Sequence, residues 1–101
     1  MNKVEAMHYK MLAIAIEVGL PKFYQDDLLV HDLYSLSELD NNEESEFYWR
    51  LRECGTQFST SEHMARYGWD NEQEYCYHGN LKTGELTKLP LPSKYRTKTA
   101  Q

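Results

Sequence analysis

Apolar residues near the start of the chain recur at the spacing of an amphipathic helix. The positions that share its apolar face are Val4, Met7, Met11, Ile14 and Val18. Residues three and four apart lie on the same side of a helix. Asn2 and Glu5 have the spacing of a capping box, while Gly19 and Pro21 are residues that end helices. The pattern predicts a helix from about residue 3 to 18.

A second helical pattern follows after residues 23–25, which we interpret as a connector whose rings pack on the core. Asp26 and Asp27 are residue types that start helices. The leucines that then repeat at helical spacing are Leu29, Leu33 and Leu36. This phase leaves Asp32 and Glu38 on the outer side. We favour a helix here over the alternative, a short strand at 28–31 followed by a turn, and expect a polar loop at 40–45.

The stretch 47–54 alternates apolar and polar residues, as a half-buried β-strand does. One face carries Phe47, Trp49 and Leu51, and the other carries Tyr48, Arg50 and Arg52. We expect the first face to pack against the N-terminal helix. The second face is either neutralised by the neighbouring acids or presented beside them.

The remaining pattern predicts one short helix and a β-hairpin. Gly55 suggests a bulge or bend. Ser59 and Glu62 repeat the capping-box signal, which predicts a helix at 62–67 that ends at Gly68. Alternation at 74–78, a turn at 80–85 and a strand at 86–89 form the hairpin. In 74–78, Tyr75 and Tyr77 share one side, and Cys76 and His78 share the other.

These elements predict an α+β fold, with an N-terminal amphipathic helix packed on a small antiparallel sheet of about three or four strands. The chain has 101 residues, which is enough for one core. We expect a single domain over 1–92 and a basic, flexible C-terminal tail over 93–101. No segment has the length and apolar character of a membrane span or a signal peptide, so we expect a cytoplasmic protein with free thiols and no membrane partner.

Charge changes the picture most, because the net charge of −5 is unevenly distributed. Between residues 23 and 49 there are eight acids and no Lys or Arg. These acids are Asp26, Asp27, Asp32, Glu38, Asp40, Glu43, Glu44 and Glu46. A row of carboxylates can imitate the phosphates of a nucleic acid and occupy a basic groove on another protein. The alternative is a solvated face that maintains solubility.

Tyr48, Arg50 and Arg52 directly follow the acidic segment and are candidate anchors for a protein partner, since Tyr and Arg are enriched at interface cores. The surrounding acids disfavour direct nucleic-acid binding. The acid pairs Asp26/Asp27 and Glu43/Glu44 lack an evident apolar pocket for acid–base work. We find no nucleotide-binding or metalloprotease motif and expect no cofactor.

A second hypothesis uses Cys54, His63, Cys76 and His78 as a tetrahedral metal set or a Cys/His catalytic module. Their spacing argues against it, because structural zinc sites usually bring ligands in Cys-x-x-Cys or His-x-x-x-His knuckles. Neither thiol is followed by a nucleophile elbow.

We therefore expect a non-enzymatic, acidic binding protein that acts by contact with another protein, and a nucleic-acid-binding protein is the candidate partner. In size and charge alone, the chain resembles the small acidic inhibitors that phages and mobile elements make against nucleases, and no residues are transferred from that likeness. Its most specific form is an inhibitor that competes with nucleic acid for a basic groove. The alternatives are the Cys/His module and a homo-oligomeric structural protein; the sequence leaves the oligomeric state open.

Overall fold

The computed structural model describes residues 2–52, 55–68 and 75–90, and it has an α+β arrangement, as predicted. The helices are α1 (Lys3–Glu17), α2 (Lys22–Asp27), the π-helical turn η1 (Leu28–Asp32), α3 (Leu33–Asn41) and α4 (Ser61–Tyr67). The strands are β1 (Glu46–Arg52), β2 (Gly55–Thr60), β3 (Tyr75–Asn80) and β4 (Glu85–Pro90). Within the described residues, no helix is both long enough and apolar enough to cross a bilayer.

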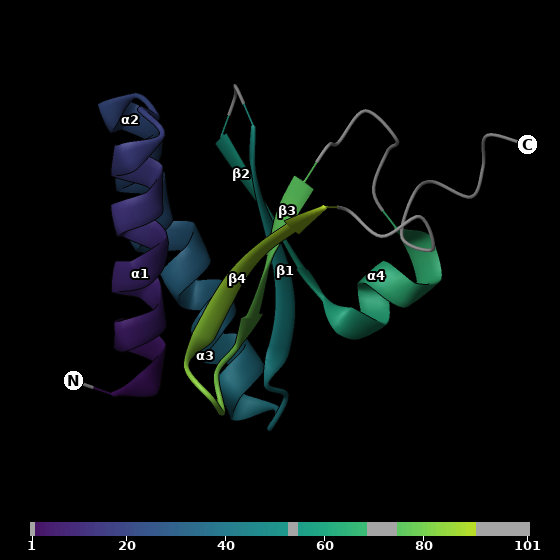
Figure 1. Ribbon diagram of the computed structural model, residues 1–101. Coiled ribbons are helices and arrows are strands. Elements are labelled where there is room, and N and C mark those ends of the chain that lie inside the picture. The colour runs from purple at the N-terminus through teal and green to yellow at the C-terminus, as the bar shows by residue number, and fades with distance from the viewer. Residues whose placement is uncertain (1, 53–54, 69–74, 91–101) are drawn as a thin grey trace, which may run out of the picture.

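The four strands form one antiparallel sheet in the order β2-β1-β3-β4. The strand predicted from alternation at 47–54 is therefore central, with β2 and β4 at the two edges. Figure 1 shows α1, α2 and α3 together on one side of the sheet and α4 on the other. The side with three helices holds the larger core.

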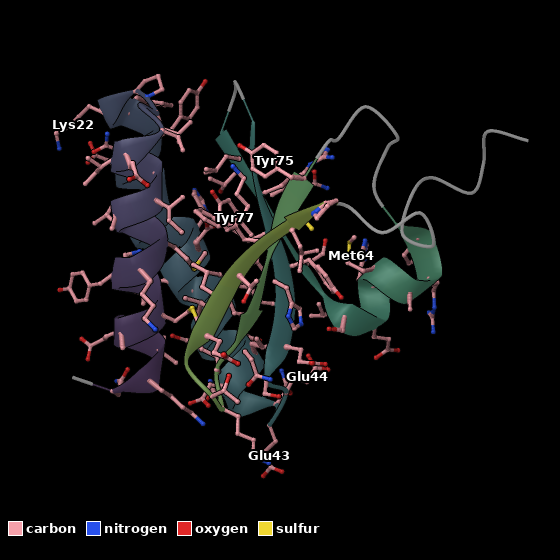
Figure 2. The ribbon with its side chains drawn as sticks, in the orientation of Figure 1. Lys22, Glu43, Glu44, Met64, Tyr75 and Tyr77 are labelled. Carbon is pink, nitrogen blue, oxygen red and sulfur yellow. The ribbon has the colours of Figure 1, made fainter. Side chains whose placement is uncertain are left out.

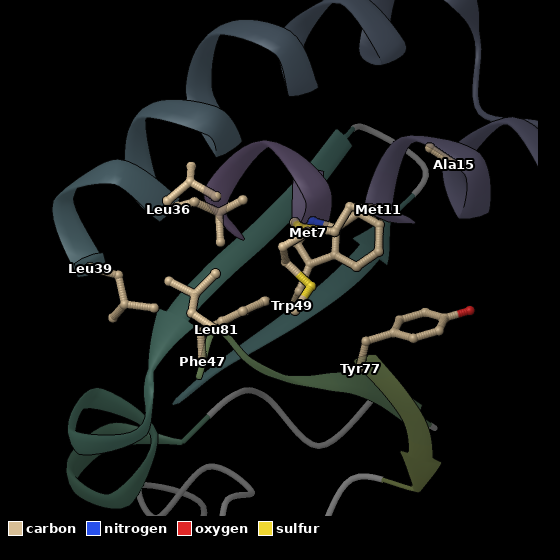
Figure 3. Packing of buried hydrophobic residues seen from close by; sticks show 10 residues of the cluster. Met7, Met11, Ala15, Leu36, Leu39, Phe47, Trp49, Tyr77 and Leu81 are labelled. Atoms are coloured by element: carbon tan, nitrogen blue, oxygen red, sulfur yellow. The ribbon is translucent and has the colours of Figure 1, made fainter. Parts of the chain in front are cut away.

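That core lies between α1, α3 and the inner face of the sheet. Its buried residues include Met7, Met11, Leu36, Leu39, Phe47, Trp49, Tyr77 and Leu81, which Figure 3 shows side by side. Phe47 stacks on Phe58 of β2 with ring centroids 4.9 Å apart. Removing this apolar surface from water is the main stabilising contribution, at about 25 cal/mol per Å².

The first helix forms as the sequence predicts. The Asn2 side chain accepts a hydrogen bond from the Glu5 backbone N–H at 2.8 Å. The Glu5 carboxylate accepts one from the Asn2 backbone N–H at 3.3 Å, which completes the capping box. Gly19 follows the helix with φ +84°, the left-handed conformation that glycine adopts without strain. One position differs: Val18 lies at the C-terminal cap and is 48% exposed.

The second helical region begins earlier than predicted and is one continuous run. Residues 23–25 are part of α2 rather than a connector, and Phe23 is 68% exposed instead of packed on the core. The run then passes through η1, which sequence periodicity does not reveal. A π-helical turn contains more residues than an α-turn, so it changes which residues after it face the sheet.

The segment after β1 also differs from expectation. Gly55 pairs with Arg52 and opens β2, so the chain forms a hairpin where we predicted a bulge or bend. The N-cap of α4 is Thr60 and not Ser59; the Thr60 Oγ1 accepts a hydrogen bond from the His63 N–H at 3.1 Å.

The predicted hairpin of β3 and β4 is confirmed, with Tyr77 facing the larger core and Cys76 facing the opposite side. The predicted tail at 93–101 and the position of Cys54 lie outside the described residues.

Candidate functional site

Five glutamates gather where α3, the following loop and the start of α4 meet, and we call them the acidic end. They are Glu38, Glu43, Glu44, Glu46 and Glu62, and all are exposed. The loop turns sharply because Glu43 adopts φ 59° and the Glu44 N–H donates back to the Leu39 carbonyl at 3.1 Å. Figure 2 shows Glu43 and Glu44 at the opposite end of the molecule from Lys22.

A shallow hollow of about 280 Å³ lies at the acidic end. It is lined by Glu43, Glu44, Ser45, Glu46, Thr60, Ser61 and Glu62. Four of these are glutamates and none is Lys or Arg. Two of the carboxylates have weak partners: Glu62 lies 3.6 Å from Arg66, and Glu46 lies 3.6 Å from His78. Exposed pairs of this kind contribute only about 0–1 kcal/mol.

A second hollow, about 230 Å³, runs between α3 and β2, and we call it the α3–β2 groove. Its lining is Tyr34, Ser35, Glu38, Leu39, Asn42, Glu44, Phe58 and Thr60. This groove is more apolar than the first hollow, and no Lys or Arg of the described residues lines it. Tyr34 is 66% exposed and lines this groove together with Glu38 and Glu44.

Two of the predicted surface acids are ion-paired with lysines of this chain. Asp40 lies 3.0 Å from the Lys3 ammonium, and Asp26 lies 3.2 Å from the Lys22 ammonium. The eight acids of residues 23–49 therefore do not form one uninterrupted negative row. Among the described residues, the exposed acids of this segment that have no Lys or Arg partner are Glu38, Glu43, Glu44 and Glu46.

Asp32 is a correction, because we predicted it on the outer side and it is 4% exposed. Its Oδ2 accepts hydrogen bonds from the Trp49 indole N–H at 2.9 Å and from the Thr56 hydroxyl at 3.0 Å. The π-helical turn places this carboxylate against the sheet. Burial raises the pKa of Asp32, while both hydrogen bonds and the charges of His8 and His31 oppose that rise. Asp32 is a structural residue here, not part of a surface.

The outer face of β1 is a second correction, because we predicted a half-buried strand and both faces are covered. Arg50 is 2% exposed and Tyr48 is 9% exposed. Tyr48 packs with Met64 of α4 and with Cys76 of β3. Figure 2 shows Met64 between α4 and the sheet. Buried side chains cannot serve as partner anchors in this conformation. The side chains of Arg52 and Asp27 lie outside what the structure describes.

The Cys/His candidates do not come together among the described residues. His63 is exposed on α4, with its ring 4.8 Å from that of Tyr67, whereas Cys76 is buried under α4. His78 is half-buried beside Tyr48. The described part of the chain contains no group of three or more His, Cys, Asp or Glu residues that could hold a metal ion.

Burial raises the pKa of the Cys76 thiol to about 11, although the nearby Arg50 charge opposes the rise. At pH 7 this thiol is neutral, and a neutral thiol is a poor nucleophile.

We expect Cys76 in the folded Cys54→Ser variant to react with iodoacetamide at least about 100-fold more slowly than the same thiol does in denaturant. Mass spectrometry against time measures this. Similar rates in both states would show that Cys76 is accessible.

Sequence reasoning missed Glu62, Tyr34 and Phe58 as members of this region. Glu62 carried only a helix-capping signal, and nothing local indicates that α4 starts beside the α3–β1 loop. No protein-family model, no curated protein and no solved structure matches the chain, so its function has to be inferred from its own residues.

Proposed function

We propose that this protein is a non-enzymatic binding protein that contacts a basic surface of another protein through its acidic end. The observation that supports this is the lining of the two adjoining hollows. Both share Glu44 and Thr60, both contain carboxylates, and neither contains Lys or Arg among the described residues. An ordinary solvated face usually mixes charges of both signs.

Concentrating like charges costs free energy in the isolated protein, because neighbouring carboxylates repel each other. A basic partner removes that cost and gains from long-range attraction, which accelerates association at low salt. The most specific form of the proposal is an inhibitor that competes with nucleic acid for a basic groove. Carboxylates on an exposed loop and helix end present negative charge as phosphates do.

The prediction that tests this proposal is a charge reversal with a matched control. The test variant is Glu43→Lys/Glu44→Lys, and the control is Glu17→Lys/Asp26→Lys, which makes the same change in net charge at the other end of the molecule. We expect the test variant to lose at least about tenfold in affinity for the partner and the control to change it far less.

The partner is first captured from the native host on immobilised protein at low and moderate salt, and affinity is then measured with the purified partner. Wild-type affinity should fall steeply as salt rises, because exposed charges are screened. Release of the partner by added nucleic acid would support the competitor form. Salt-insensitive binding, or equal losses in the two variants, would exclude a contact through the acidic end.

A further inference from the structure

The two edges of the sheet differ in their protection against strand addition. The β4 edge carries Glu85, Lys88 and Pro90, and the Lys10 side chain of α1 donates to the Gly84 carbonyl at its start. Charged residues, proline and cover are the usual means by which proteins block an edge. The β2 edge, with the sequence Gly-Thr-Gln-Phe-Ser-Thr, has no charge and no proline. Among the described residues, no strand pairs with it.

The ladder fixes which β2 residues turn their backbone groups toward that open edge. The Leu81 N–H donates to the Ser45 carbonyl at 2.7 Å, which continues the β1–β3 ladder by one residue pair. Odd-numbered residues of β1 therefore direct their backbone groups toward β3. Even-numbered β1 residues therefore face β2, where their partners include Gln57 and Ser59. By alternation, Thr56 and Phe58 direct their N–H and C=O groups outward.

Hollows flank this edge on both faces of the sheet. The α3–β2 groove lies on the side of the larger core, and another hollow on the α4 side is lined by Gln57, Phe58, Ser59, Thr60 and His63. Phe58 and Thr60 line both. An added strand would consequently find space on either face for its alternating side chains.

We propose that the β2 edge accepts an extended, basic segment of the partner protein as a fifth strand of the sheet. This inference rests on the proposed function and specifies how the partner is held. Outward backbone groups of Thr56 and Phe58 provide main-chain hydrogen bonds, and alternate side chains of the segment enter the α3–β2 groove. Glu38, Glu44 and the exposed ring of Tyr34 there suit a Lys or Arg, whose stem is apolar and whose head is positive.

The test uses the full chain and a ten-residue peptide that alternates Lys with Val and Thr. A matched peptide has an N-methyl group on every residue, which removes the backbone donors of both edges and retains the charge. A third peptide replaces Lys by Glu. Amide hydrogen exchange is followed by NMR at Thr56, Phe58, Gln57 and Ser59.

With the basic peptide at ten times its dissociation constant, we expect exchange at the outward amides of Thr56 and Phe58 to slow about tenfold. Gln57 and Ser59 are internal controls, since their amides already face β1, and they should change little. The N-methylated and acidic peptides should give no slowing at the outward amides. Equal slowing by the N-methylated peptide would show binding by charge alone and overturn the added strand.

Two further outcomes would also overturn it. If the amides of Thr56 and Phe58 exchange slowly in the protein alone, the edge is already covered. Light scattering then gives the molar mass: a dimer indicates a second copy on the edge, and a monomer indicates a segment of the same chain. If Glu43→Lys/Glu44→Lys abolishes partner binding while the partner leaves both amides unprotected, the proposed function holds and the added strand fails. Conversely, if the partner protects both amides of the wild type while its binding is unchanged by Glu43→Lys/Glu44→Lys, the added strand holds and the proposed contact through the acidic end fails.

Discussion

Replacing Asp32 by alanine will lower the free energy of unfolding by about 2–4 kcal/mol, because it leaves a buried indole N–H without an acceptor. The lost acceptor is Oδ2, which serves both Trp49 and Thr56. Trp49 is 0% exposed, so its indole N–H has no contact with bulk water. Urea denaturation followed by circular dichroism measures the loss.

The matched control is Asp32→Asn, which keeps an oxygen in the accepting position and removes the charge. We expect a clearly smaller loss than with alanine. If the two variants are equally destabilised, the negative charge and not the hydrogen-bond acceptor is what the fold requires. If neither is destabilised, the buried contact contributes nothing measurable.

The same carboxylate gives a pH dependence whose sign follows from its pKa. Burial raises the pKa of Asp32 above its ordinary value of 3.8, so the folded state binds this proton more tightly than the unfolded state. The resulting stabilisation is fully present below pH 3.8 and is lost as pH rises through the folded pKa. Wild-type protein should therefore lose stability relative to Asp32→Asn as pH increases above about 4. A difference that grows in the other direction would contradict this sign.

Replacing Gly79 by alanine should cost about 1–3 kcal/mol, because the core has no space for one more methyl group. A Cβ atom at Gly79 would lie 2.0 Å from the Phe47 ring, which is fully buried and stacked on Phe58. The ring is held from its other side and cannot move away without disturbing the core. Thermal or urea unfolding measures the loss.

Two controls separate this overlap from other effects of removing a glycine. Gly19→Ala has nothing within 4 Å of the new Cβ and tests only the strain of a positive φ. The double variant Gly79→Ala/Phe47→Leu reduces the overlap, so its loss should be smaller than the sum of the two single losses. Strict additivity would show that the ring and the new methyl group do not compete for space.

The acidic end shows how far sequence reasoning reached for the candidate site. The charge imbalance of residues 23–49 pointed to Glu38, Glu43, Glu44 and Glu46, which are exposed. The prediction for Asp32 was wrong because the helical phase was extended through a π-helical turn that no residue pattern marked. The prediction for Arg50 was wrong because a polar residue on the second face of a strand was expected to be solvated, whereas α4 and Cys76 lie against that face.

The sequence by itself determined the elements whose signals are local. Capping residues and apolar spacing defined α1, and alternation with turn residues defined β1 and the β3–β4 hairpin, because these signals act over a few residues. Only the tertiary structure decided the sheet order, the burial of Arg50 and Asp32, and the meeting of Glu62 with the α3–β1 loop. Each of these depends on contacts between residues far apart in the chain, where packing overrides the local pattern.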